Sequence, residues 1–116
     1  MNIDRSNCRG DHYIVPLIEQ VVEWHYERNL IKGATEKDQF VKLSEEFGEL
    51  AGNVCRGNDI RDDIGDMVVV LINLAERRGY TLAECLLVAW LDIKDRKGKM
   101  VDGMYVKESD LKGVNL

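Results

Sequence analysis

The sequence predicts an all-α domain of four helices that ends in a small β-hairpin. Apolar residues recur at helical spacing in four segments, and residues typical of helix starts and stops bound these segments. One Asp-Gly pair near the end of the chain is flanked by short apolar runs. The chain has 116 residues, 45% of them hydrophobic, which suits one folded domain. We expect residues 1–10 to form a flexible tail and residues 11–116 a single domain.

The first two helices are predicted from their spacing and from their ends. Apolar residues recur at helical spacing from Ile14, and the first helix should run to about Asn29. Pro16 falls in its first turn, where a missing N–H is tolerated. A helix-start signal at Thr35 opens the second helix. That helix should stop at Gly57, which suits a left-handed cap.

The third helix should begin after Asn58 or Asp59, since either side chain can cap it. Its first turns are acidic, and the stretch from Met67 to Ala75 is then almost wholly apolar. A helix that is apolar on all sides is buried on more than one side. In so small a domain, part of this helix is expected to pack against a second subunit.

The last two elements are a fourth helix and a hairpin. A capping box at Thr81 begins the helix, which should run to about Lys97. Its core face should include Cys85. The pair Asp102 and Gly103 is the hairpin signal.

Charge and cysteine usage exclude several classes of protein. The net charge of −5 argues against a partner that is a nucleic-acid polymer or an anionic membrane. Three cysteines, without a CxxC pair, indicate free thiols in a reducing compartment, and we expect Cys55 to be a small core residue. No signal peptide is evident, and the longest apolar stretch is too short to span a bilayer. The sequence therefore predicts a cytoplasmic protein with no membrane contact.

Two clusters of carboxylates at helical spacing are the most informative feature, and their members are Glu45, Glu46, Glu49, Asp62, Asp63 and Asp66. Residues three or four positions apart share a helix face, so the clusters converge if the two helices pack together. Like charges ~4 Å apart repel by ~4 kcal/mol at an effective dielectric constant of ~20. Such a cluster must stay apart, take up protons or hold cations.

An acidic run is often only a solvated helix face, and composition alone favours neither interpretation. Asp66 favours a functional site, because it leads into the most apolar helix, where a charge without a partner is costly to bury. No histidine joins the clusters, since His12 and His25 lie elsewhere, which argues against zinc and di-iron sites. Helix-borne carboxylates suit Mg²⁺, with Mn²⁺ as a substitute, and indicate phosphate chemistry.

The chain resembles the MazG-type all-α nucleoside triphosphate pyrophosphohydrolases in the segments Gln39-x-x-Lys42-x-x-x-Glu46, Glu45-Glu46-x-x-Glu49 and Asp63-Ile64-Gly65-Asp66. The family pattern is EExxE, a short spacer and ExxD, and the basic segment 94–100 is similar to that of small family members. The resemblance covers roughly residues 35–106. It implies a four-helix MazG-like bundle, assembled as a homodimer or homotetramer. It also implies hydrolysis of a (d)NTP between the α and β phosphates to NMP and pyrophosphate.

The resemblance further implies roles for individual residues. Metal ligation falls to Glu46, Glu49, Asp63 and Asp66. Either Glu45 or Glu49 would orient or deprotonate the attacking water, and the choice between them is open. The family usually has Glu where this chain has Asp63, so Asp63 would bind through water or Asp62 would replace it.

The candidate substrate-binding residues are Trp24, Gln39, Lys42, Lys94, Arg96 and Lys97. Lys42 precedes Glu46 by one helical turn and so lies within reach of a phosphate beside the metals. The three C-terminal basic residues would clamp distal phosphates, although a basic helix end that complements the helix dipole explains them equally well. Trp24 would face the base, but a Trp at this spacing is more often a core residue.

Two other functions remain open at this point. The same metal site would suit hydrolysis of a guanosine alarmone, (p)ppGpp. Alternatively, the chain is a non-catalytic, nucleotide- and metal-binding regulatory dimer, a reading that the Asp63 departure keeps open.

Overall fold

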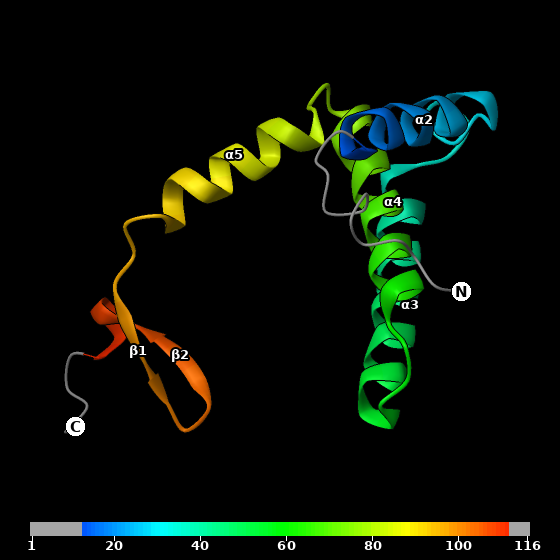
Figure 1. Cartoon of the computed structure of the whole chain (residues 1–116). Coiled ribbons are helices and arrows are strands. Elements are labelled where there is room, and N and C mark those ends of the chain that lie inside the picture. Colours follow the sequence, from blue (N-terminus) through cyan, green and yellow to red (C-terminus); the bar gives the residue numbers. More distant parts are fainter. Residues whose placement is uncertain (1–12, 112–116) are drawn as a thin grey trace. The chain divides into compact units, whose positions relative to one another are not determined.

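The computed structural model describes residues 13–111, which divide after Leu82 into two compact units (Figure 1). The first unit contains α2 (Ile14–Glu27), α3 (Glu36–Arg56) and α4 (Arg61–Arg77). The second unit contains nearly all of α5 (Leu82–Ile93), then β1 (Gly98–Val101), β2 (Met104–Lys107) and the 3-10 helix η2 (Glu108–Leu111). A mostly helical chain with a two-stranded hairpin is thereby confirmed. The expected tail, residues 1–10, lies outside the described residues.

The first helix and both ends of the second match the prediction. α2 begins at Ile14, so Pro16 does lie in its first turn. The hydroxyl of Thr35 accepts a hydrogen bond from the Asp38 N–H at 3.1 Å, which caps the start of α3. Gly57 ends α3 at a φ of 70°, in the left-handed region that glycine adopts without a Cβ penalty.

The start of α4 differs from the prediction. Ile60, rather than Asn58 or Asp59, occupies the cap position, and its side chain makes no capping hydrogen bond. Asp59 instead accepts from the backbone N–H of Arg61 at 2.9 Å and pairs with the guanidinium of the same residue. This side-chain pairing lowers the pKa of Asp59 to about 2. Asp59 lies one residue before the cap position, and its carboxylate thus binds Arg61, the first residue of α4.

The helices of the first unit pack around α4. Both α2 and α3 contact it, and Figure 1 shows α3 and α4 side by side, with α2 lying across α4. Among residues 13–111 the buried apolar residues are Val70, Ile72 and Ala75, all on α4, so the expected burial is confirmed for these three, while residues 67–69 and Leu74 are half-buried. Leu71, however, is exposed.

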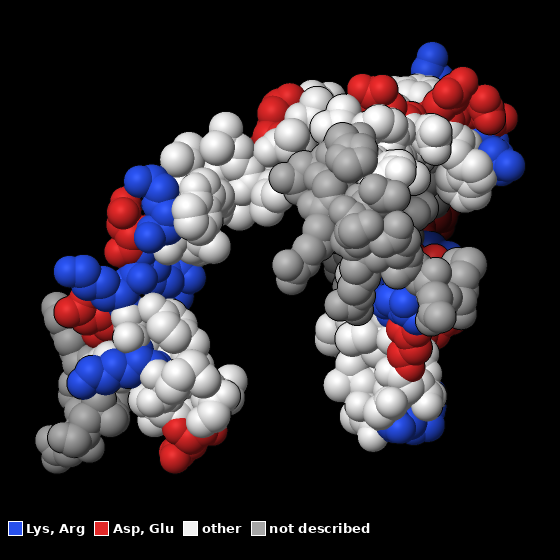
Figure 2. Space-filling view, viewed as in Figure 1, with Lys and Arg blue, Asp and Glu red and all other residues white. Residues whose placement is uncertain are grey.

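The fourth helix is shorter and less buried than expected. α5 ends at Ile93, four residues before Lys97, and contains no buried residue. Figure 2 shows the middle of α5 without charged side chains on the visible face. Cys55 and Cys85 are both exposed, so the prediction that they are core residues was wrong. Among residues 13–111, no helix is long and apolar enough to cross a membrane.

The hairpin is confirmed at its predicted turn. β1 and β2 pair antiparallel, with Val101 opposite Met104. Asp102 and Gly103 have φ values of 50° and 80°, the two positive values that a type I′ turn requires. Both strands contact η2, which covers this small sheet within the second unit.

Candidate metal centre

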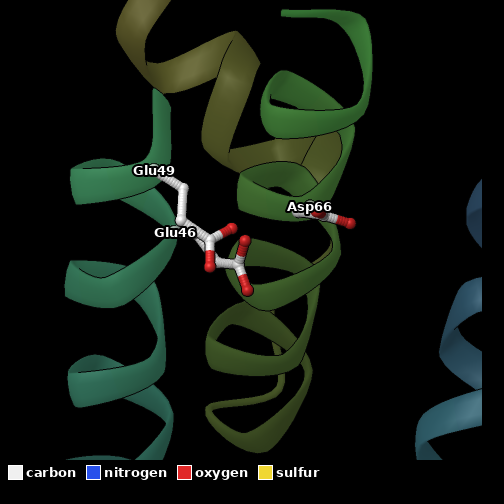
Figure 3. Close-up of side chains that lie close together, drawn as sticks. All are labelled: Glu46, Glu49 and Asp66. Atoms are coloured by element: carbon white, nitrogen blue, oxygen red, sulfur yellow. The ribbon is translucent and has the colours of Figure 1, made fainter. Parts of the chain in front are cut away.

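Three carboxylates converge where α3 packs against α4. Glu46 and Glu49 of α3 and Asp66 of α4 each place an oxygen within 4.8 Å of the other two. Figure 3 shows the two glutamates reaching from α3 toward α4, where Asp66 lies. The i, i+3 spacing brings the glutamates to one face of α3, and helix packing supplies the aspartate. The sequence-based expectation that the two clusters converge is met by these three residues.

Glu46 is the buried member of this group. The residue is 6% exposed, and its Oε1 lies 3.0 Å from Lys42 Nζ. Its Oε2 is buried and has no hydrogen-bond partner among the residues that the structure describes. Leaving a buried carboxylate oxygen without a partner costs free energy, and native proteins rarely do so without a ligand or function. A cation at this oxygen would remove that cost.

The carboxylates of the cluster repel one another when ionised, and this raises the pKa of two of them. The negative charge of Glu46, assisted by desolvation, raises the pKa of Glu49. Burial, followed by the charges of Asp62, Glu46 and Asp63, raises the pKa of Asp66. Oxygen donors that repel one another in this way fit a hard divalent cation such as Mg²⁺ or Mn²⁺. The residues present therefore fit the expected metal.

The Lys42 ammonium pairs with the acidic cluster and does not simply extend into solvent. Besides the pair with Glu46, its Nζ lies 3.8 Å from Glu45 Oε2. The hydrogen bond and charge of Glu46, with smaller contributions from Glu45 and Glu49, raise the pKa of Lys42. Lys42 therefore stays protonated and partly neutralises the cluster.

Asp63 takes a different partner from the other acids. It is buried, and its Oδ2 accepts a hydrogen bond from the Asn53 amide at 3.0 Å. The Asn53 oxygen in turn accepts from the Asn58 amide at 3.0 Å. Asp63 still lies close enough for its charge to raise the pKa of Glu49. Its role as a metal ligand stays a prediction. Asn53 was missed, although it follows Glu49 by four residues on α3 and so shares its face.

A pocket of about 550 Å³ opens beside the cluster, and its lining includes Trp24, Gln39, Lys42, Glu45, Glu46 and Asp66. Three predicted substrate-binding residues thus face the same space as two members of the carboxylate trio. The volume lies within the usual range for small-molecule sites. Glu45 lines this pocket without belonging to the trio, which separates it from Glu49.

Trp24 is not the core residue that its spacing favoured. It is 39% exposed, and the Arg28 guanidinium lies 4.7 Å from the centre of its ring. Trp24 also lines a neighbouring pocket of about 420 Å³ with Gln20 and Asp66. Arg28 was not singled out from the sequence, although its position four residues after Trp24 on the helix indicates the contact.

The three predicted basic residues of the C-terminal segment belong to the second unit. Lys94 Nζ lies 3.1 Å from Asp95, and Arg96 pairs with Asp92 at 2.9 Å. These pairs are local and exposed, and such pairs contribute little to stability. A role of Lys94, Arg96 and Lys97 in binding phosphates stays a prediction.

A second polar cluster, unforeseen from the sequence, fixes α2 against α4. His25 Nε2 donates to the Val69 carbonyl at 2.8 Å, which makes Nδ1 the acceptor of the ring. The Asn73 amide donates to that Nδ1 at 3.3 Å and to the Leu30 carbonyl at 3.0 Å. The Asn73 oxygen accepts from Arg77 Nε at 3.0 Å. Because Trp24 precedes His25, this network also positions the aromatic wall of the pocket.

Comparison with known proteins finds one uncharacterised relative. The chain is 43% identical over 63 residues to a protein of Haemophilus phage HP1 (strain HP1c1), described as an uncharacterised 18.2 kDa protein in the rep-hol intergenic region. The match covers 53% of this chain and 39% of the phage protein, so the chain spans well under two thirds of that relative. No protein-family model matches the chain, and no solved structure matches it.

Proposed function

We propose that this protein is a MazG-like, Mg²⁺-dependent nucleoside triphosphate pyrophosphohydrolase. The observation that carries the proposal is Glu46. Its Oε2, buried and without a hydrogen-bond partner among residues 13–111, belongs to a three-carboxylate group beside a pocket of about 550 Å³. An acidic surface without a ligand would leave its oxygens in water, whereas this oxygen is withdrawn from water and receives no hydrogen bond from the described residues. The reaction would convert a (d)NTP and water to the corresponding (d)NMP and pyrophosphate.

In this proposal the carboxylates divide the work. Glu46, Glu49 and Asp66 would hold Mg²⁺ or its substitute Mn²⁺, with Asp63 as a further ligand, direct or through water. When bound, the metal would stabilise charge on phosphate oxygens and lower the pKa of a water molecule. Glu45 is the better candidate to orient and deprotonate that water, because it lines the pocket while Glu49 is occupied in the trio.

Substrate contacts follow the lining of the pocket. Lys42 would bind a phosphate, since its ammonium lies at the edge of the carboxylate group. Trp24 offers an exposed ring for stacking, and Gln39 offers an amide for hydrogen bonds.

The proposal includes a four-helix bundle and self-association to a homodimer or homotetramer. Large apolar side chains are exposed on each of the described α-helices, among them Phe40 and Phe47 of α3 and Leu86 and Trp90 of α5. Contiguous exposed apolar surface commonly marks an interface. Light scattering coupled to size-exclusion chromatography should give at least twice the 13.3 kDa chain mass. We also propose a cytoplasmic location, which the free thiols of Cys55 and Cys85 favour.

The test is pyrophosphate release from a panel of NTPs and dNTPs with Mg²⁺. Wild type should release pyrophosphate, and Glu49→Gln should reduce the rate by about a hundredfold or more, because it removes a ligand charge at nearly constant shape. Glu23→Gln is the matched control, since Glu23 is an exposed carboxylate of α2. It should leave the rate unchanged.

The same assay separates the rival functions. Release from (p)ppGpp but from no NTP or dNTP would replace the substrate class and keep the metal site. Tight nucleotide binding with Mg²⁺ but without turnover would identify a regulatory module. Equal rates for wild type and Glu49→Gln would contradict the proposed site itself.

A further inference from the structure

Lys42 is a cation that the protein itself supplies to the acidic cluster. Its ammonium occupies one oxygen of Glu46 at 3.0 Å, while the other oxygen is buried without a partner among residues 13–111. Its positive charge also acts to lower the pKa of Glu49 and of Asp66, against the burial and the neighbouring carboxylates that raise them. A divalent cation bound at Glu46 would have to share this space with the ammonium.

The position of Lys42 allows it to leave Glu46 without a change in the backbone. Lys42 and Glu46 lie one turn apart on α3, so their pairing depends on side-chain rotamers alone. The Lys42 side chain is 53% exposed, and it lines the pocket together with Trp24 and Gln39. Its flexible stem and compact charge let it move between a carboxylate and a phosphate.

Resting on the proposed function, we propose that Lys42 gives up Glu46 to the divalent cation and turns into the pocket, where its ammonium binds a substrate phosphate. Two like-charged groups compete for Glu46, so the ammonium weakens cation binding when no substrate is present. Once displaced, the ammonium strengthens substrate binding. Lys42 thereby makes the binding of cation and substrate cooperative, and linkage requires that each ligand tightens the other by the same factor.

The first experiment measures Mn²⁺ binding by isothermal titration calorimetry, without nucleotide. Lys42→Met, which keeps length but not charge, should bind Mn²⁺ about tenfold more tightly than wild type, since it removes a charge that competes beside partly buried carboxylates. Lys42→Arg should bind as wild type does. Lys37→Met is the control, because Lys37 is an exposed lysine of the same helix. It should not change the affinity.

The second experiment measures binding of inorganic triphosphate, a probe without a base. With Mg²⁺ present, Lys42→Met should bind it about tenfold more weakly than wild type, in keeping with the loss of one charge-assisted contact. Without Mg²⁺, the two proteins should bind it equally, because Lys42 is then held by Glu46. An equal loss in both conditions would overturn the exchange and leave Lys42 as a fixed phosphate ligand.

The outcomes separate this inference from the proposed enzyme. If Lys42→Met binds Mn²⁺ no more tightly than wild type while pyrophosphate is released, the exchange is wrong and the enzyme stands. If Mn²⁺ binding tightens and the loss of triphosphate binding requires Mg²⁺, but no nucleoside triphosphate is hydrolysed, the exchange stands and the enzyme does not. Circular dichroism and thermal unfolding would show whether each variant is folded. Lys42→Arg changes the side chain but keeps its positive charge, so it separates the effect of the charge from the effect of any other change at this position.

Discussion

The two polar clusters on α4 differ in how their buried groups are satisfied. Toward the end of the helix, Asn73 donates and accepts at once, and it joins His25, Arg77 and the Leu30 carbonyl in a network in which donors meet acceptors. Near the start, Asp66 meets other carboxylates, which only accept. The cluster around Asn73 therefore satisfies its polar groups within the chain, whereas in the acidic cluster Lys42 pairs with one oxygen of Glu46 and the other buried oxygen has no partner among the described residues.

One of the two clusters therefore stabilises the fold, whereas the other is suited to binding a ligand. The network around Asn73 holds α2 against α4 and needs nothing from outside. In the group around Glu46, one buried carboxylate oxygen has no hydrogen-bond partner in the described part of the chain, and such an oxygen lowers the stability of the fold. Local conflicts of this kind are expected at functional sites. Perturbing each cluster separately tests the comparison.

The largest effect on stability is expected from Asn73→Leu. Asn73 is fully buried, and the change leaves His25 Nδ1 and Arg77 Nε without their partner. Loss of these hydrogen bonds should lower the free energy of unfolding by about 3 kcal/mol, measured by urea denaturation. The loss should be the same with and without Mn²⁺. A loss below about 1 kcal/mol would mean that the network does not hold the two helices together.

A smaller effect concerns the pH dependence of the acidic cluster. The pKa values of Glu49 and Asp66 are raised above their ordinary values of 4.5 and 3.8. Such groups bind more protons in the folded state than in the unfolded state. The stability they contribute is present below the unfolded pKa and is lost as pH rises through the raised pKa. Without divalent cations, stability should therefore fall as these carboxylates ionise.

The measurement compares wild type with Glu49→Gln in chelator, by thermal unfolding from about pH 4 to about pH 7. Other carboxylates titrate in both proteins, so the difference between the two curves isolates Glu49. Wild type should lose more stability over this range than the variant. Parallel curves would show that the neighbours of Glu49 do not oppose its charge.

The smallest effect is expected at an exposed ion pair between Glu36, the first residue of α3, and Arg78, the residue that caps the end of α4. Arg78 Nε donates to Glu36 Oε2 at 2.7 Å, and the two side chains are 59% and 45% exposed. Solvent screens such pairs, so Glu36→Gln should lower the melting temperature far less than Asn73→Leu does. The small difference should vanish at about 1 M salt, where charges are screened within a few ångströms. A loss that persists in high salt would indicate a contribution other than charge.

Local chemistry made parts of the fold predictable. The start of α3 at Thr35, its end at Gly57 and the Asp102-Gly103 turn each depend on a few neighbouring residues, and all three were predicted correctly. The end of α5 and the cap at Ile60 were not, because the sequence offers competing signals there. Helical spacing placed Glu49 on a face with both Glu45 and Glu46, and only the packing of α3 against α4 selected Glu46.

Long-range contacts set the limit of prediction. Asn73 and His25 are 48 residues apart, so their hydrogen bond follows only from the crossing of α2 and α4. Spacing indicated that Asp63 and Asp66 share a face, but not that Asp63 would bind Asn53 while Asp66 joins Glu46. The burial of Glu46 likewise depends on how closely two helices pack. These features carry most of the functional argument.

The most direct test of the contrast is thermal unfolding of wild type and Glu46→Gln over a series of Mn²⁺ concentrations. A cation that binds only the folded state stabilises it by about 2.7 kcal/mol at a hundred times its Kd. The melting temperature of wild type should therefore rise steadily with Mn²⁺, while that of Glu46→Gln stays constant. A wild-type melting temperature that does not move at millimolar Mn²⁺, or an equal rise in both proteins, would contradict a cation site at Glu46.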